Sequence, residues 1–85
     1  IIGAAKSLAV EMGRRNINVN IIAPGYIDTE FISDMREHFD EMKKQVPMRR
    51  IGTVEDIANV TEFLISEKAS YIQGQVIAVN GGVLT

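Results

Sequence analysis

The sequence predicts an α/β fold in which two parallel strands share a sheet and helices lie on its faces. Residues 17–22 and 75–79 are short and rich in isoleucine and valine, which is typical of strands. More than 50 residues of mainly helical pattern separate the two segments, so they cannot form a hairpin. This spacing favours parallel strands joined by a crossover, and helices normally cover such a sheet on both faces.

The first predicted element is a helix over residues 1–12. Gly13 stands where a left-handed cap would end it, and Arg14 and Arg15 lie near its negative end. Lys6 falls on the exposed side, where a solvated side chain is the expected role. Apolar residues recur at three- and four-residue spacing and form one stripe: Ile1, Ile2, Ala5, Leu8, Ala9 and Met12.

The second predicted element is the strand over residues 17–22. Its isoleucines and valine alternate with asparagines, so the apolar side chains fall on one face. Pro24 and Gly25 are expected to end this strand, because proline cannot donate to a ladder and glycine tolerates a turn.

Residues 29–46 have a weaker pattern, which predicts one or two short amphipathic helices with a partly wet face. Pro47 ends this region, and His38 within it is expected to face water. The apolar residues are scattered among charged ones: Phe31, Ile32, Met35, Phe39 and Met42.

A further helix is expected to begin after Thr53, a favourable N-cap residue that is followed by Glu55 and Asp56 in the positive first turn. A turn at residues 71–74 then leads into the last strand, and residues 80–82 form another turn. The buried side of the helix is predicted to comprise Ile57, Val60, Leu64 and Ile65, with Phe63 flanking it.

Composition excludes several classes of function. The 85 residues carry a net charge of −2 with a pI near 5.3, which does not provide the basic surface that nucleic acids require. No apolar run approaches the length of about 18 residues that spans a bilayer, so no membrane partner is expected. Cysteine is absent, which is compatible with a reducing cytosol, and no carboxylate–histidine cluster predicts a metal site.

The amino-terminal position falls inside a helical pattern. Ile1 belongs to the apolar stripe of the first helix rather than preceding it. Two parallel strands do not form a stable sheet alone. We therefore expect this sequence to be cut from a longer chain, whose other part supplies the missing strands.

Residues 20–29 form a corner between a buried strand and the next helix. In an open α/β sheet, ligands bind beyond the carboxyl ends of the strands, where this corner lies. Backbone groups at Tyr26 and Ile27 could bind a planar amide, and the Thr29 hydroxyl could bind a phosphate or an amide. From physics alone, a purely structural turn is the more common role of such a corner.

Four segments resemble the short-chain dehydrogenase/reductase family, and together they cover essentially the whole chain. Residues 1–9 resemble the helix that follows the family's Tyr-x-x-x-Lys motif. Residues 20–29 fit the pattern N-x-x-x-P-G-x-x-x-T of its nicotinamide loop. Residues 50–58 fit R-x-G-x-x-E-D-I-A, and residues 70–82 resemble the last strand with its flanking turns. Gln73 stands where the family more often has threonine, which we interpret as a minor departure.

The resemblance implies that residues 1–85 are the C-terminal part of a Rossmann-like doubly wound parallel sheet, with its last two strands and their helices. Pro24, Gly25, Ile27 and Thr29 would bind the nicotinamide cofactor, NADP or NAD, and residues 30–46 would form a lid over the substrate. No catalytic residue falls within the chain, because the resemblance places the catalytic lysine and tyrosine before its first residue. The 85 residues alone are therefore expected to be inactive.

Within the family, the chain is similar to the 3-oxoacyl-[acyl-carrier-protein] reductases of fatty-acid synthesis. This similarity implies a cytoplasmic reductase, assembled as a homotetramer through residues 76–79. Tyr26 and Met35 would border the substrate, and Arg15 would contact the acidic acyl carrier protein, although structural roles are open for all three. Two alternatives remain at this point: a family member acting on an alcohol, sugar or steroid, and a noncatalytic assembly module.

Overall fold

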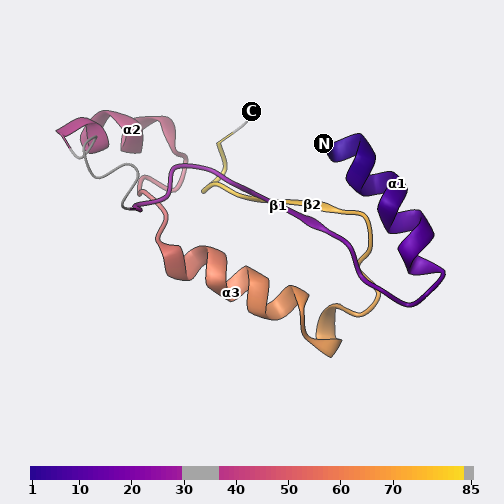
Figure 1. Cartoon of the computed structure of the whole chain (residues 1–85). Helices are drawn as coiled ribbons and strands as arrows, with labels where there is room; N and C mark the ends of the chain where they lie inside the picture. The colour runs from indigo at the N-terminus through magenta and orange to yellow at the C-terminus, as the bar shows by residue number, and fades with distance from the viewer. Residues whose placement is uncertain (30–36, 84–85) are drawn as a thin grey trace.

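The computed structural model describes residues 1–29 and 37–83. Figure 1 shows two central strands, with one long helix on each side of the pair and a short helix beyond the carboxyl ends of the strands. The described helices and strands follow in the order α1 (Ile2–Gly13), β1 (Ile21–Pro24), α2 (Phe39–Gln45), α3 (Val54–Leu64), the 3-10 helix η2 (Glu67–Ala69) and β2 (Val76–Val79).

The two strands are parallel, as the sequence predicts. Ile21 pairs with Val76, and the register continues to Pro24 opposite Val79. The predicted bounds of the first strand were wrong at both ends, because β1 begins four positions later than expected and includes Pro24. Immediately after the strand, the Gly25 N–H donates to the Val79 carbonyl at 3.0 Å, so the pairing extends into the corner.

The segment before β1 is held mainly by side chains, although the Val19 carbonyl accepts from the Gly74 N–H at 2.8 Å. The Gln73 amide nitrogen donates to the carbonyls of Ala9 at 2.7 Å and Ile17 at 3.0 Å, while its oxygen accepts from the Val19 N–H at 2.9 Å. Asn20 adds a bond to the Ile72 carbonyl and accepts from the Gln75 N–H. The departure at Gln73 is therefore not minor, because one amide joins α1 to the entrance of β1.

The end of α1 also differs from the prediction. Gly13 is not the left-handed residue; Asn16 is, with φ 60°. The Asn16 N–H donates to Gly13 and the Ile17 N–H to Met12, which is the bonding pattern of a Schellman motif. Asparagine can take this conformation because its short polar side chain tolerates it. Arg14 continues the helical backbone, with φ −64°.

The start of α3 is as predicted, but its far end is not. Thr53 caps the helix and accepts from the Asp56 N–H, while the Asp56 side chain accepts from the Thr53 N–H, so the two form a capping box. Ile65, predicted to be buried, follows the last helical residue and is 81% exposed. The spacing of apolar residues predicts the buried face of a helix only within the helix, and Ile65 lies beyond its last residue.

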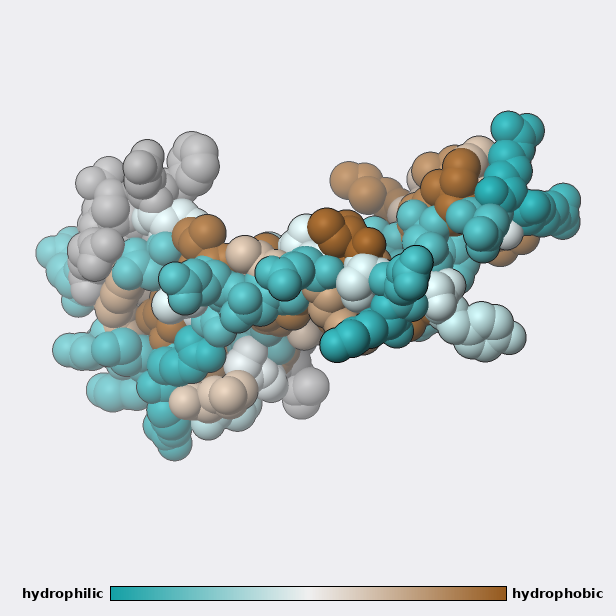
Figure 2. Space-filling model, turned by 90° about the horizontal axis from the view of Figure 1, so that it is seen from below, coloured by the Kyte–Doolittle hydropathy of each residue, from teal (hydrophilic) through white to brown (hydrophobic). Residues whose placement is uncertain are grey.

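Little of the apolar surface is covered within this chain. The buried side chains of the described residues lie outside the two strands and α3: Ala9, Met42, Val46, Ile51 and Ala69. Figure 2 shows hydrophobic surface at several places along one face, and large apolar side chains such as Ile2, Leu8 and Val10 of α1 are exposed. The predicted apolar stripe of α1 is therefore only partly covered, because the sheet formed by the described residues has two strands and is too narrow to cover the whole stripe.

Candidate functional site

The corner after β1 is held by a backbone bridge to a distant glycine. The Gly52 N–H donates to the Tyr26 carbonyl at 2.9 Å, and the Gly52 carbonyl accepts from the Asp28 N–H at 2.8 Å. These bonds form an isolated parallel bridge between Ile27 and Gly52. The corner is therefore fixed on both sides of Ile27 and is not a loose turn.

The bridge decides where the backbone groups of Ile27 point. Within a trans peptide group the N–H and C=O point in opposite directions. The Ile27 N–H, opposite the Tyr26 carbonyl, and the Ile27 C=O, opposite the Asp28 N–H, therefore face away from Gly52. Among the described residues, neither group has a backbone partner. A donor and an acceptor are thus presented side by side, which is the complement of a planar carboxamide with its own N–H and C=O.

Thr29 lies two residues further along the same segment and is half-buried. In the part of the chain that the structure describes, no hydrogen bond is recorded for its hydroxyl. Asp28, between Ile27 and Thr29, is bonded through its N–H to Gly52. The candidate ligand-binding groups at this corner are therefore the N–H and C=O of Ile27 and the hydroxyl of Thr29.

A cavity of about 520 Å³ lies beside the corner. Its volume is within the range of sites for small molecules, roughly 300–1,000 Å³. Tyr26 lies in its wall and donates from its hydroxyl to the Gln45 side chain at the end of α2, at 3.0 Å. The remaining lining comes from the corner, the loop before α3, α3, β2 and the turn after β2: Ile27, Val46, Met48, Arg50, Gly52, Asp56, Val60, Ala78, Val79, Asn80, Gly81 and Gly82.

An ion pair encloses Gly52. Two nitrogens of Arg50 donate to the two oxygens of Asp56, at 2.8 and 3.2 Å. The Asp56 carboxylate also accepts from the N–H of Thr53 at 2.8 Å and from its hydroxyl at 3.2 Å. The hydrogen bond from Arg50, followed by that from the Thr53 backbone, lowers the pKa of Asp56 well below its ordinary value of 3.8. The same pair raises the pKa of Arg50.

The lowered pKa of Asp56 predicts how stability depends on pH. The folded protein favours the ionised carboxylate, so its contribution is fully present above the unfolded pKa of about 4 and is lost as pH falls below it. We expect Asp56→Asn to lower the urea midpoint at pH 7, and the difference from the native protein to shrink steadily below about pH 4. Glu55→Gln, on the same turn, is the matched control. A difference that stays constant down to about pH 3 would contradict this linkage.

The comparisons with known proteins agree with one another. A family model described as enoyl-(acyl carrier protein) reductase matches residues 1–84. The chain is 52% identical over 83 residues to 3-oxoacyl-[acyl-carrier-protein] reductase FabG of Aggregatibacter actinomycetemcomitans, covering 98% of this chain and 34% of that protein. The chain belongs to the short-chain dehydrogenase/reductase family. It spans about a third of the length of the curated relatives it matches.

Solved structures of short-chain dehydrogenases/reductases share this arrangement. The NADPH-dependent reductase YwfH, involved in bacilysin biosynthesis, superposes with a TM-score of 0.89 at 34% identity, covering 99% of this chain and 36% of that one. A short-chain dehydrogenase/reductase of the glucose/ribitol dehydrogenase type from Brucella melitensis gives 0.90 at 34% identity, covering 99% of this chain and 34% of that one. The predicted fold class, a C-terminal part of a Rossmann-like sheet, is confirmed.

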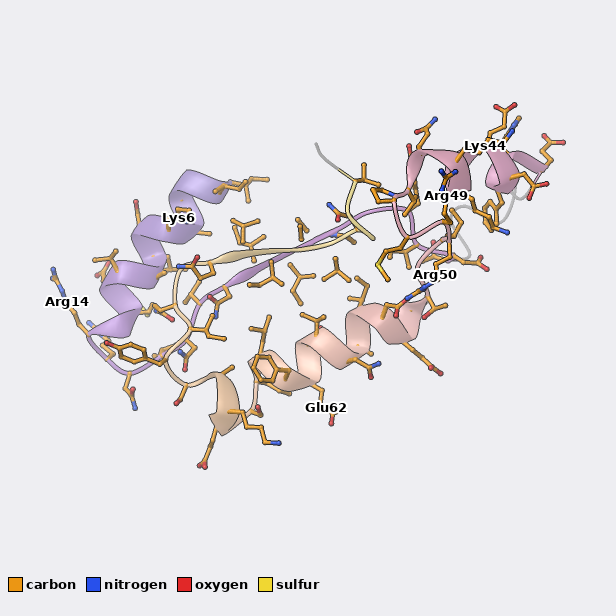
Figure 3. All side chains as sticks on the ribbon, turned by 180° about the vertical axis from the view of Figure 1, so that it is seen from behind. Lys6, Arg14, Lys44, Arg49, Arg50 and Glu62 are labelled. Carbon is orange, nitrogen blue, oxygen red and sulfur yellow. The ribbon has the colours of Figure 1, made fainter. Side chains whose placement is uncertain are left out.

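The predicted site residues of this short-chain dehydrogenase/reductase segment do not all come together. Pro24, Gly25, Tyr26, Ile27 and Thr29 share the corner at the carboxyl end of β1. Arg15 follows α1 at the opposite end of that strand, as the position of the neighbouring Arg14 in Figure 3 indicates. Met35, and residues 30–36 of the proposed lid, lie outside the described residues.

Lys6 and His38, which the sequence predicts to face water, both lie on the surface. Lys6 is exposed, but it is not purely solvated, because its ammonium donates to the Gly74 carbonyl at 2.9 Å. His38 is exposed as expected and lies 3.5 Å from Glu37. Over residues 1–29 and 37–83, no cluster of His, Cys, Asp or Glu could hold a metal ion. None of the helices in those ranges is long and apolar enough to cross a bilayer.

Sequence reasoning missed Gly52. An added Cβ there would lie 2.7 Å from the Ile27 Cδ1 atom, so the Ile27 side chain would have to shift to admit any other residue. The signal was present in the segment R-x-G-x-x-E-D-I-A, whose arginine and aspartate enclose that glycine. The sequence pattern alone assigns Asp56 only a charge at the positive end of a helix.

Proposed function

We infer that this chain is the C-terminal part of an NADP- or NAD-dependent carbonyl reductase that acts on 3-oxoacyl groups carried by acyl carrier protein. The observation that carries the cofactor site is the pair of backbone groups on Ile27, held outward by the bridge to Gly52. The reaction and the substrate class are supported by the relatives named 3-oxoacyl-[acyl-carrier-protein] reductase.

The residues of the corner fit a nicotinamide cofactor. The Ile27 C=O would accept from the carboxamide nitrogen, and the Ile27 N–H would donate to its oxygen. Thr29 would donate from its hydroxyl to the carboxamide or the pyrophosphate. When bound, the cofactor supplies the hydride. The contribution of this chain is to hold the ring in one orientation through a rigid corner, and orientation is a large part of rate enhancement.

Substrate and partners are assigned to other surfaces of the chain. Tyr26 and Met35 would border the acyl group, beneath a lid formed by residues 30–46. Arg15 lies at the far end of β1, so it would meet an acidic carrier protein there and not at the corner. Assembly as a cytoplasmic homotetramer would use residues 76–79, which form β2.

The decisive assay uses the full-length protein that contains this chain. We expect it to oxidise NADPH or NADH when given a 3-oxoacyl thioester of acyl carrier protein, followed by the loss of nicotinamide absorbance. A protein that reduces only sugar or steroid ketones would belong to the alternative reductase class. A protein that consumes neither cofactor with any carbonyl would be the noncatalytic assembly module, and the proposal would fail.

Thr29 provides a residue-level test of the cofactor site. We expect Thr29→Val, which keeps the shape but removes the hydroxyl, to raise the KM for the dinucleotide about 5- to 10-fold, as expected for a lost hydrogen bond of about 1–1.5 kcal/mol. Thr29→Ser keeps the hydroxyl and should stay within about twofold of the native enzyme. A loss in Thr29→Ser as large as that in Thr29→Val would contradict a role specific to the hydroxyl, because serine keeps that group.

A further inference from the structure

The loop before α3 is closed by one carboxylate. Asp56 accepts from Arg50 on one side of Gly52 and from the backbone of Thr53 on the other. Figure 3 shows Arg50 where this loop meets the start of α3. The Arg50 guanidinium also lies 3.4 Å from the Ile51 carbonyl. Residues 50–53 are thus bent around the carboxylate, with Gly52 inside the bend.

Helix capping does not require the bond to Arg50. The capping box consists of Thr53 and Asp56 alone, and it would be complete without the arginine. The two side chains of the ion pair are 52% and 30% exposed, and pairs in such positions usually contribute little to stability. The fork of Arg50 instead adds geometric definition, because two parallel hydrogen bonds fix the angle between guanidinium and carboxylate.

The loop that the Arg50–Asp56 pair fixes is bonded directly to the corner through Gly52. Gly52 holds both the Tyr26 carbonyl and the Asp28 N–H, and these two bonds set the direction of the peptide groups of Ile27. Gly52 also packs close to the Ile27 side chain, since an added Cβ would lie 2.7 Å from its Cδ1 atom. A shift of the bend therefore moves both backbone hydrogen bonds and, with them, the peptide groups of Ile27.

We propose that Asp56, held by Arg50, is a positioning residue that acts through Gly52 to aim the Ile27 N–H and C=O at the carboxamide of the nicotinamide cofactor. This inference rests on the proposed function, since it assumes that the corner binds a nicotinamide. It assigns a role in cofactor orientation to an ion pair that touches neither the cofactor nor the substrate.

The test combines a variant with a change in the cofactor. Asp56→Asn in the full-length enzyme keeps an oxygen to accept from Thr53 but loses the charged fork to Arg50. Glu55→Gln is the control, because it removes a charge from the same helical turn. Affinity is measured for the natural dinucleotide and for its 3-acetylpyridine analogue, which lacks the N–H donors of the carboxamide, by quenching or transfer of fluorescence. Thermal unfolding of each variant checks that it is folded.

We expect Asp56→Asn to weaken binding of the natural cofactor about 5- to 20-fold, the size of effect that a small misplacement produces. Glu55→Gln should stay within about twofold. With the analogue, the native enzyme already lacks one contact to Ile27, so the further loss caused by Asp56→Asn should fall below about threefold. Non-additivity of this kind indicates that the two changes affect the same interaction.

The remaining outcomes are distinguishable. Equal losses for both cofactors would overturn the positioning role while leaving the cofactor site intact. A native enzyme that binds the two dinucleotides equally would overturn the carboxamide site itself. If Asp56→Asn does not fold, Arg50→Lys keeps the charge and the capping box but loses the fork, and the same non-additive pattern is expected of it.

Discussion

Replacing Gly25 with alanine is expected to lower the free energy of unfolding by about 2–4 kcal/mol and to weaken cofactor binding more than about tenfold. An added Cβ would lie 2.6 Å from the Asn80 Cβ and 2.8 Å from its Cα, so backbone atoms would have to move. Asn80 cannot yield easily, because its side chain donates to the Val83 carbonyl and accepts from the Gly82 N–H. The carboxyl ends of β1 and β2 would be forced apart where the corner begins.

The measurement is urea unfolding of the full-length protein, together with titration of the dinucleotide. Gly3→Ala is the control, because nothing lies within 4 Å of the position of its added Cβ. Alanine at this position, in the first turn of α1, should stabilise the protein by up to about 0.5–1 kcal/mol, which is the opposite sign. Normal stability of the Gly25 variant would mean that the two strand ends can separate without cost, contrary to the structure.

Truncation of Gln73 to alanine is expected to cost about 2–4 kcal/mol of stability. The variant would leave three backbone groups without their present partners: the carbonyls of Ala9 and Ile17 and the N–H of Val19. Two of these bonds are partly buried, where an unsatisfied group is more costly. Gln73→Glu should have a smaller but clear effect, because it keeps the acceptor and loses both donors.

Gln75→Ala serves as the comparison for Gln73. Its side chain makes one recorded bond, to the Gln73 carbonyl at 3.1 Å, and it is exposed. We expect a change within about 0.5 kcal/mol, which is usual for a surface substitution. Equal effects from the two glutamines would refute the idea that one amide joins α1 to β1.

The elements that follow from short-range signals were predictable. Thr53 was expected to cap α3 because its hydroxyl and the acidic first turn are close in sequence, and the structure contains the full capping box. The parallel pairing of the strands followed from their composition and from the long helical segment between them. Both predictions rest on patterns that side chains express directly.

The errors in the fold arose where polar side chains compete with the backbone. Residues 17–20 have the alternation of a strand, yet Gln73 and Asn20 take hydrogen bonds that a ladder would otherwise use. At the end of α1, asparagine takes the left-handed position that a glycine three residues earlier was expected to fill. In each case the structure is decided by a glutamine or an asparagine, and an analysis of hydrophobic spacing counts these residues only as polar.

The corner was predictable but its support was not. Pro24 and Gly25 after an apolar strand mark a turn at the ligand-binding edge of a sheet. The bridge from Ile27 to Gly52 joins distant parts of the chain through backbone atoms alone, and such contacts leave no trace in side-chain pattern. Only the residues that surround Gly52, an arginine and an aspartate, indicated that the position is special.

The parallel register also bears on how this part of the protein is made. Pairing of Ile21 with Val76 joins residues 55 positions apart, like the bond between Gln75 and Asn20. The chain between the two strands must lose loop-closure entropy before the first hydrogen bond between them can form. Pairing of β1 with β2 is therefore slow. During translation, β1 emerges well ahead of β2, so the edge that β2 will pair stays open during that interval.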